Sequence, residues 1–514
     1  MPFKASHSFG RKISAPTAAP VISGTISIGS AIAWSSVQGA SNYTLYRGSI
    51  NAGNITSPYT CVEADCNGNS ITIKANNSGG SSPSSNALFY SPIALTNLRS
   101  WLRSDSLTLS GSNVSLWPDQ SGHNNDFAAL ATSPLRVSGY NGVSGVFAVR
   151  GDGNAAGLRK TTFDWGAAVD QYTIITVGTV NSLTADALYW QYNGGGSQIP
   201  YLYSLNASSG SAKMFGPGNV TTTGVESGLQ PQVVVASWDG SVQKIYDSTR
   251  LGNTSSNVNS GPPNSASFTM LGSAANTLFL NADLVEMAAM RKAITDNELR
   301  SFSYYARWRY NIATRVIFCG DSIVYGYGPP YIGGYRPEVL TACTNAGINT
   351  QQVGSINGPN GFHRGIAGEQ LADVAANLST LDTVLTTNSA ARLADIVCGA
   401  WGTNDALVNS GTDVSATMLV NAGIIMDQMK TSLPNAKWLW QTCTRPTDPS
   451  FSGLLASIDG YNAGLAALCA SKGFTLIQIP STVTFLSVSV HPDVAGYTTM
   501  SVPIAAAIIA AARS

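Results

Sequence analysis

The most conspicuous shortage in this chain of 514 residues is charge. Only 11% of the residues are Asp, Glu, Lys or Arg, and 28 basic residues balance 28 acidic ones. A chain without net charge lacks the attraction to phosphate on which nucleic-acid binding and attachment to anionic membranes depend. We therefore expect neither nucleic acid nor a membrane surface among its partners.

Long hydrophobic runs are scarce as well. The C-terminal run, residues 502–512, is short and rich in alanine, which favours a buried final helix over a membrane span. The N-terminal MPFKASHSFGRKISAPTAAP has basic residues but no apolar core typical of a secretory signal peptide. We therefore expect an extracellular role to need another route, such as assembly into a phage particle that lysis releases.

Cysteine patterns give no sign of a metal site. The chain has seven cysteines, and none stands in a CxxC or Cys/His spacing that is typical of zinc. Cys61 and Cys66 flank a short loop and could form a disulfide or remain free thiols. The other five lie in predicted strands and helices, where cysteine usually acts as a small buried hydrophobe. No metal or organic cofactor is implied.

The length predicts several domains, roughly two to four. Residues 1–18 resemble a flexible leader whose role, if any, would be attachment. Residues 19–91 alternate apolar and polar positions in AIAWSSV, NYTLYRG and SITIKANN, which predicts a small β-sandwich. This stretch resembles a fibronectin type III-like domain, and the resemblance implies a spacer or docking module without chemistry.

Residues 93–310 contain further strand patterns and end in a predicted helix, DNELRSFSYYARWRYNI, with Asp296 as its expected N-cap. Together with SLWPDQSG and SWDGSVQKIYD, this helix resembles a concanavalin A-like, laminin-G-type jelly roll. The resemblance implies glycan binding, whereas Trp117, Asp119 and Ser121 are expected only to hold the fold together.

From residue 315 onward, apolar strands such as RVIFCG and ADIVCGAWG alternate with helical segments. This alternation predicts a parallel sheet with helices on both faces. The expected fold is therefore multidomain, with an all-β N-terminal part (β-sandwich plus jelly roll) followed by an α/β three-layer sandwich.

Three short blocks fall at the ends of these strands or in the loops beyond them. They read IFCGDS (residues 317–322), WGTND (401–405) and VHPDVAGY (490–497). Functional sites of parallel sheets gather at the carboxyl ends of the strands. The blocks supply Ser322, Asn404 and His491, which are the residue types that ester hydrolysis needs.

Residues 314–514 resemble the SGNH (GDSL) hydrolase family through these blocks in this order. The resemblance implies that Ser322 is the nucleophile and that His491 is the general base that takes its proton. The implied oxyanion donors are the backbone N–H of Ser322, the N–H of Gly368 in HRGIAGEQL, and the side chain of Asn404. Gly365 also fits the glycine position.

The chain departs from the family at the acid. The family places an acid three residues before the histidine, and that position is Val488 in this chain. Three interpretations remain open: a Ser–His dyad, a substitute acid such as Asp448 after WLWQTCT, or a degenerate domain that only binds. The first two are favoured, because a decayed site has no chemical reason to keep the serine, the histidine and the oxyanion donors.

The hypothesis from sequence is a serine esterase that removes O-acetyl groups from a surface polysaccharide, as part of a phage tail fibre or tailspike. Such a protein would be extracellular or virion-associated and attached to the tail or baseplate through its N-terminus. Such proteins are often homotrimers, although no coiled coil is visible here. The alternatives are a secreted bacterial carbohydrate esterase and a non-catalytic glycan-binding adhesin.

Overall fold

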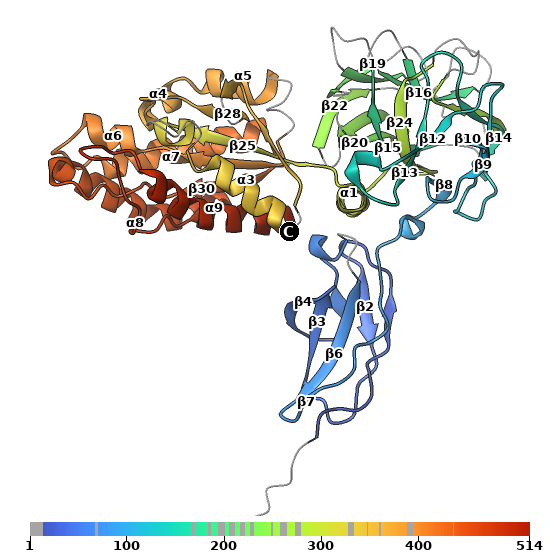
Figure 1. The fold of residues 1–514 in the computed structure, drawn as a ribbon, viewed down its shortest axis with the longest axis horizontal. Helices are drawn as coiled ribbons and strands as arrows, with labels where there is room; N and C mark the ends of the chain where they lie inside the picture. The colour runs from blue at the N-terminus through green and yellow to red at the C-terminus, as the bar shows by residue number, and fades with distance from the viewer. Residues whose placement is uncertain are drawn as a thin grey trace, which may run out of the picture. The chain divides into compact units, whose positions relative to one another are not determined.

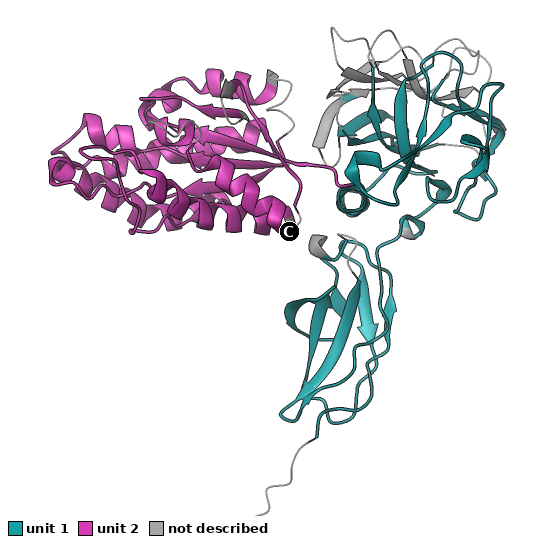
Figure 2. Ribbon diagram, in the orientation of Figure 1, with its two compact units in different colours: residues 1–310 teal, residues 311–514 magenta. Residues whose placement is uncertain are grey.

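The chain divides into two compact units, residues 1–310 and 311–514 (Figure 2). The computed structural model describes residues 14–66, 70–166, 170–182, 187–193, 201–204, 211–215, 221–226, 231–247, 250–256, 265–272, 279–326, 334–346, 348–358, 361–387, 394–434 and 436–513. Most of the predicted leader lies outside these residues.

The first unit begins with two small antiparallel sheets. One sheet has the order β1 (Ile22–Gly24), β2 (Ala31–Trp34), β5 (Tyr59–Thr60), and the other β4 (Ile50–Ile55), β3 (Asn42–Arg47), β6 (Ile71–Asn77), β7 (Gly80–Ser81). The side chains of Ile32, Leu45 and Ile73 are buried, as the alternating pattern requires. Cys61, and Cys66 at the end of the 3₁₀-helix η1 (Glu63–Cys66), are buried free thiols.

The rest of the first unit is a network of antiparallel strands between η2 (Pro92–Ala94) and helix α1 (Asp296–Tyr310). Its centre is formed by two nine-residue strands, of which β24 is buried throughout and pairs with β15. The residue ranges of the elements in this region are β8 (Leu98–Arg103), β9 (Thr108–Ser110), β10 (Asn113–Trp117), β11 (Phe127–Ala129), β12 (Leu135–Ser138), η3 (Tyr140–Gly142), β13 (Phe147–Arg150), β14 (Leu158–Asp164), β15 (Tyr172–Val180), β16 (Ala187–Asn193), β17 (Tyr201–Ser204), β18 (Ser211–Phe215), β19 (Thr221–Glu226), β20 (Gln232–Trp238), β21 (Val242–Asp247), β22 (Arg250–Ser256), β23 (Ser265–Met270) and β24 (Ala282–Met290).

Two sets of polar hydrogen bonds stabilise this β-rich region. The Asp119 carboxylate accepts hydrogen bonds from the backbone N–H groups of Trp101, Ser121 and Asn125 at 2.8–3.0 Å. At helix α1 the cap is Thr295 rather than the predicted Asp296. The Thr295 hydroxyl accepts from the N–H of Glu298, whose carboxylate accepts in return from the N–H of Thr295. This reciprocal pair is a capping box, which places the helix start one residue earlier than expected.

The second unit is built on a mainly parallel sheet of order β27-β28-β25-β29-β30-β31, with β26 also paired to β25. Only the β27–β28 hairpin is antiparallel among these described pairs. The strands are β25 (Thr314–Gly320), β26 (Thr350–Val353), β27 (Ile356–Gly358), β28 (Gly361–Gly365), β29 (Ile396–Ala400), β30 (Lys437–Gln441) and β31 (Thr475–Ile477). The helices are α2 (Ser322–Tyr325), α3 (Arg336–Asn345), α4 (Leu371–Ala376), α5 (Leu378–Thr387), α6 (Thr403–Val408), α7 (Ser415–Ser432), η5 (Pro449–Leu454), α8 (Leu455–Lys472) and α9 (Val494–Arg513).

Helices cover both faces of this sheet, which gives three layers (Figure 1). Successive residues of β25 point to opposite faces, so that Val316 and Phe318 join the core under α3 and α9. Ile317 and Cys319 join the core under α4, α5, α7 and α8. A strand buried on both faces explains why RVIFCG is apolar throughout rather than alternating.

Helix α9 is long and apolar enough to cross a membrane by length and composition alone. In this structure its inner face packs into the second unit, where Tyr497, Met500, Ile504 and Ile508 are buried. Burial of these side chains in a shared core accounts for the apolar residues on the inner face of the helix.

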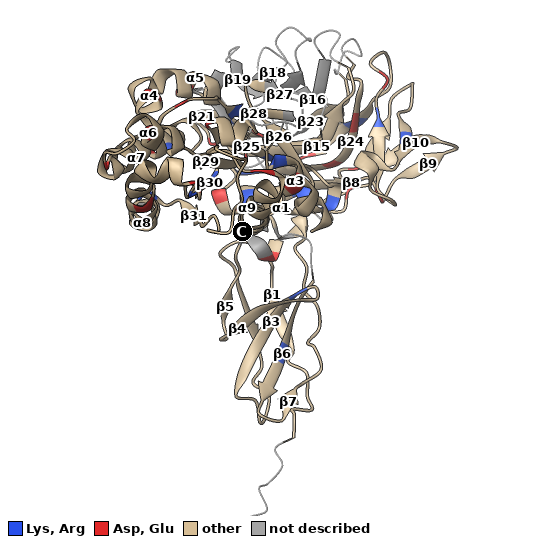
Figure 3. Cartoon of the chain, turned by 60° about the vertical axis from the view of Figure 1, so that its left-hand side comes forward, with Lys and Arg blue, Asp and Glu red and all other residues tan. Residues whose placement is uncertain are grey.

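Charged residues of both signs are interspersed along the chain (Figure 3). Several are joined in pairs, such as Arg150 with Asp283 at 2.6 Å and Arg445 with Asp459 at 2.9 Å. Pairing of this kind leaves little net field of one sign near either unit.

Candidate active site

The carboxyl ends of three neighbouring strands bring the candidate site together. Gly320, the last residue of β25, lies in register with Gly365 of β28 on one side and with Ala400 of β29 on the other. Because the three strands are parallel, the segments that follow them emerge at one edge of the sheet. Those segments contain Ser322, Gly368 and Asn404.

Ser322 is the first residue of the short helix α2, and its side chain is buried apart from a small exposed part. Asp321 caps this helix, because its carboxylate accepts from the N–H of Ile323 at 2.9 Å. Gly320 must be a glycine: a Cβ there would lie 2.3 Å from the carbonyl oxygen of Ala400. The close approach of β29 to β25 therefore sets the position of the serine.

His491 reaches Ser322 from a loop before helix α9. Its Nε2 lies 2.9 Å from the Ser322 Oγ, a hydrogen-bond distance. Two backbone bonds close this loop, from Leu486 N–H to the His491 carbonyl at 3.0 Å and from Asp493 N–H to the Thr484 carbonyl at 3.1 Å. Burial lowers the pKa of the His491 imidazole below 6.5. The ring is therefore neutral at pH 7 and able to take a proton.

Gly368 lies in a tight turn directly after β28. Its φ of +81° and the hydrogen bond from Glu369 N–H to the Ile366 carbonyl at 3.2 Å fit a type II turn with glycine at the third position. The turn is joined to the nucleophile strand, because Ile366 N–H donates to the Gly320 carbonyl at 2.9 Å. The alternative glycine, Gly365, donates its N–H to His363 Nδ1 at 2.9 Å. Of the two glycines, Gly368 is therefore the better candidate for an oxyanion donor.

Asn404 lies in the first turn of α6 and is mostly buried. Its side-chain Nδ2 donates to the Glu369 carbonyl at 3.0 Å. An amide nitrogen carries two hydrogens, so this bond orients the group while leaving a second N–H. The bond also fixes the side chain of Asn404 against the turn that contains Gly368.

Sequence reasoning did not single out Arg364 and Glu369, which hold this turn. The Glu369 carboxylate accepts two hydrogen bonds from the Arg364 guanidinium and one from Trp401 Nε1 at 2.9 Å. Both charged side chains are nearly buried, with 3% and 11% exposed. The only sequence signal is an opposite-charge pair flanking the glycine loop in HRGIAGE.

Two other polar residues near the site make contacts that stabilise the fold. Asp405 accepts from the N–H groups of Leu371 and Ala372 at 2.7 and 3.2 Å, and so caps helix α4. His363, which could have lined the site, is fully buried in the strand β28. Burial, with a smaller contribution from Arg336, lowers the pKa of His363 to about 4.

The hydrogen bond at His491 Nδ1 comes from neither of the two candidate acid positions. Val488 has a left-handed φ of +50°, and 67% of it is exposed. Asp448 caps η5, where its carboxylate accepts from the hydroxyl and the N–H of Ser450. These bonds lower the pKa of Asp448. The group beside His491 Nδ1 is the hydroxyl of Ser489, 3.2 Å away.

Within the described residues, no group of three or more His, Cys, Asp or Glu side chains is placed to hold a metal ion. The groups that the structure places at this edge of the sheet are a serine hydroxyl, a neutral imidazole and amide donors. Such a set performs nucleophilic attack on a carbonyl carbon.

Comparison with known proteins places this site in a family. Residues 318–499 match the model of the GDSL-like lipase/acylhydrolase family. No curated protein matches the chain. Similar solved structures include a family 3 carbohydrate esterase from Clostridium thermocellum (23% identity, 39% of this chain and 100% of that chain, TM-score 0.32). Others are a family 3 carbohydrate esterase from Talaromyces cellulolyticus (23%, 38% and 97%, 0.32) and a lipolytic G-D-S-L family protein from Veillonella parvula (22%, 37% and 96%, 0.28). The family match, which spans the segments that carry Ser322, Asn404 and His491, assigns residues 318–499 to a GDSL/SGNH hydrolase domain.

Proposed function

We propose that this protein is a serine esterase that removes acyl groups, in the first place O-acetyl groups, from a surface polysaccharide. The observation that carries the proposal is the 2.9 Å contact between Ser322 Oγ and His491 Nε2. A hydroxyl paired with a neutral imidazole is the arrangement that ester cleavage requires.

The reaction follows from these groups. His491 Nε2 takes the proton of Ser322 while Oγ attacks the ester carbonyl, and the carbonyl oxygen becomes an oxyanion. His491 then gives that proton to the departing sugar alkoxide, which leaves an acyl-serine. A water molecule, deprotonated by the same nitrogen, releases the acid and restores Ser322.

The oxyanion would be stabilised by the N–H groups of Ser322 and Gly368 and by the side chain of Asn404. Each such donor typically contributes about 2.7–4 kcal/mol of transition-state stabilisation. The bonds from Ile366 to Gly320 and from Asn404 to Glu369 hold these donors on adjacent strands, so little reorganisation is needed during the reaction.

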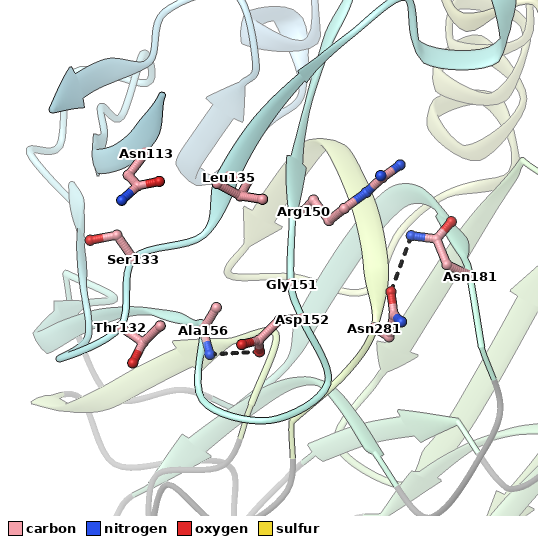
Figure 4. A pocket seen from close by; sticks show the side chains of 10 residues that line it. All are labelled: Asn113, Thr132, Ser133, Leu135, Arg150, Gly151, Asp152, Ala156, Asn181 and Asn281. Carbon is pink, nitrogen blue, oxygen red and sulfur yellow. Dashed lines mark hydrogen bonds between the residues drawn. The ribbon is translucent and has the colours of Figure 1, made fainter. Parts of the chain in front are cut away.

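A polysaccharide substrate is supported by a cavity of about 680 Å³ in the first unit, whose lining includes several polar side chains (Figure 4). Amide and hydroxyl groups from Asn113, Thr132, Ser133 and Asn281 line it, and sugar hydroxyls bond well to such groups. A separate sugar-binding cavity would raise the local concentration of a polymeric substrate, because binding at one site makes engagement of the other intramolecular.

The proposal includes a place on a phage tail fibre or tailspike, extracellular or virion-bound, with attachment to the tail or baseplate through the N-terminal region. Residues 19–91 form one sheet of three strands and one of four, which supports a fibronectin-like spacer. The low charge and the glycine- and serine-rich β segments support a spacer followed by a jelly-roll body. A homotrimer is the proposed assembly. A secreted bacterial carbohydrate esterase would use the same site, and the genes beside this one distinguish the two settings.

A non-catalytic glycan-binding adhesin is the second candidate, and the cavity in the first unit is the observation in its favour. Acetate release from O-acetylated polysaccharides and hydrolysis of p-nitrophenyl acetate separate the two. We expect turnover by the intact chain, its loss in Ser322→Ala, and its retention in Ser471→Ala, which removes an exposed hydroxyl from helix α8 of the same domain. Equal, background-level release by all three proteins, with glycan binding retained, would favour the adhesin.

A further inference from the structure

The imidazole of His491 has a neighbour on the side opposite to Ser322. Its Nδ1 lies 3.2 Å from the hydroxyl oxygen of Ser489, which also accepts the backbone N–H of His491 at 3.0 Å. One oxygen thus contacts both the ring and the main chain of the same residue. This arrangement fixes the rotation of the ring relative to its own backbone.

The chemistry of the site decides which atom carries the proton. For Nε2 to accept the proton of Ser322, the neutral ring must carry its hydrogen on Nδ1. The group facing Nδ1 must then be an acceptor. A hydroxyl oxygen has two lone pairs, so Ser489 can accept from Nδ1–H and from the backbone N–H of His491 together.

The backbone conformation of the loop explains why residue 489, and not residue 488, contacts His491 Nδ1. Val488 adopts φ +50° and directs its side chain largely to solvent. A β-branched residue rarely adopts this conformation, so the loop around it must hold the residue there.

We propose that Ser489 is the positioning residue of His491 and takes, as a neutral acceptor, the place that a carboxylate occupies in a full triad. The proposal rests on the esterase function proposed above. Ser489 touches no reacting atom; it acts by fixing the tautomer and the orientation of the ring and by stabilising the imidazolium that forms when Nε2 is protonated.

A purely local role for Ser489 is the competing explanation. A serine hydroxyl that accepts the N–H two residues later forms an ordinary turn, which needs no catalytic purpose. Loss of the turn alone would reduce stability without changing the basicity of the ring. The two explanations therefore differ in the titration of His491 and not only in activity.

The other charged groups of this loop region have partners of their own. Asp493 accepts from the Thr484 hydroxyl and from Gly496 N–H, and Asp448 accepts from the hydroxyl and the N–H of Ser450. Asp321 is buried next to Ser322 in the chain. These groups stay in place when residue 489 is changed, so a change in titration reports the group at Nδ1.

The test compares Ser489→Ala, Ser489→Thr and Ser489→Asp in the full chain by the pH profile of kcat/KM on p-nitrophenyl acetate. We expect Ser489→Ala to lose about tenfold in kcat, the size of one neutral hydrogen bond. The midpoint of its acidic limb should fall by about half to one pH unit, because the imidazolium loses an acceptor. Threonine keeps the hydroxyl and should restore both values.

Aspartate at position 489 can accept the same backbone N–H and places a negative charge beside the ring, so it should raise the midpoint by about one unit or more. Val488→Asp is the matched control, because a carboxylate on that exposed position should shift the midpoint less. Unchanged kcat and midpoint in Ser489→Ala, with only a lower melting temperature, would overturn the proposal.

A second readout separates this proposal from the proposed function. The imidazole signal of His491, assigned by its loss in His491→Gln, is titrated by NMR in the wild-type chain and in Ser489→Ala. A lower midpoint in the variant supports the role of Ser489 even if no ester is cleaved, and identical midpoints refute it. Activity of the wild-type chain against Ser322→Ala tests the esterase function independently.

Discussion

Replacing Asn404 by alanine tests the oxyanion site most directly. The side chain donates one hydrogen to the Glu369 carbonyl at 3.0 Å, and its second hydrogen is the proposed donor to the oxyanion. Loss of one such donor costs about 2.7–4 kcal/mol in the transition state, so kcat should fall about 10²- to 10³-fold. KM should change little, because the oxyanion exists only after attack has begun.

The same substitution also lowers the stability of the fold, and this effect can be separated from the effect on kcat. Removing the bond leaves the Glu369 carbonyl unpaired in a mostly buried setting, at a cost of about 1–3 kcal/mol. A domain of this size loses roughly 2–4 °C of melting temperature per kcal/mol, so the assay must run well below the transition. Asn409→Ala is the matched control: it removes the side-chain amide of the residue that caps the end of α6, which donates to the Asp405 carbonyl at 2.8 Å.

The assay is the initial rate on p-nitrophenyl acetate at saturating and limiting substrate, with folding followed by circular dichroism. We expect Asn409→Ala to keep wild-type kcat. A folded Asn404→Ala protein with kcat within about tenfold of wild type would refute the assignment of this amide to the oxyanion, because a weaker effect matches an ordinary hydrogen bond.

Three further predictions concern charge and protonation. Because burial lowers the pKa of His491, kcat/KM should rise with pH through a midpoint below 6.5 and then level off; a midpoint above 6.5 in the pH profile contradicts this. Arg364→Ala leaves the nearly buried Glu369 carboxylate without its charged partner and should cost about 3–5 kcal/mol in urea unfolding, with reduced kcat; a loss under 1 kcal/mol, on the order of a surface pair, would exclude a stabilising role for this ion pair. Burial raises the pKa of Asp321 to about 7, so the native state keeps a proton that the unfolded chain releases near pH ~4, and wild-type stability falls as pH rises between these values. Asp321→Asn removes that loss, so its stability relative to wild type should increase from pH 5 to pH 8; a constant difference refutes the shift.

The sequence was sufficient to predict a strand where the local pattern and the tertiary environment agree. The strands β25 and β29 are continuous apolar runs that end in glycine or alanine, and both lie between two helical layers. The hairpin β27–β28 was not predicted, because its segment is rich in Gly, Asn and Pro. Its pairing depends on contact with β25, where Cys319 faces Arg364 and Gly320 faces Gly365. Register between distant segments is not encoded in the local pattern of either one.

The residues of the candidate site likewise fall into those that the sequence predicts and those that only the structure reveals. Ser322, Asn404 and His491 lie in motifs whose spacing can be recognised, and the structure brings Ser322 and His491 within hydrogen-bond distance. The contacts of Ser489 and Glu369 depend on loop conformation, such as the left-handed backbone at Val488 and the turn at Gly368. A serine two residues before a histidine has no distinctive pattern, so its role could be found only from coordinates.

The hydrogen bonds from Ile366 to Gly320 and from Asn404 to Glu369 join the serine and its oxyanion donors to adjoining central strands. The imidazole, in contrast, belongs to a surface loop outside the sheet that is closed by a few backbone bonds. Loops of this kind open locally at lower free-energy cost than central strands. On warming, the proton acceptor would therefore leave first, and heat inactivation would precede melting and reverse on cooling while the sheet stays intact.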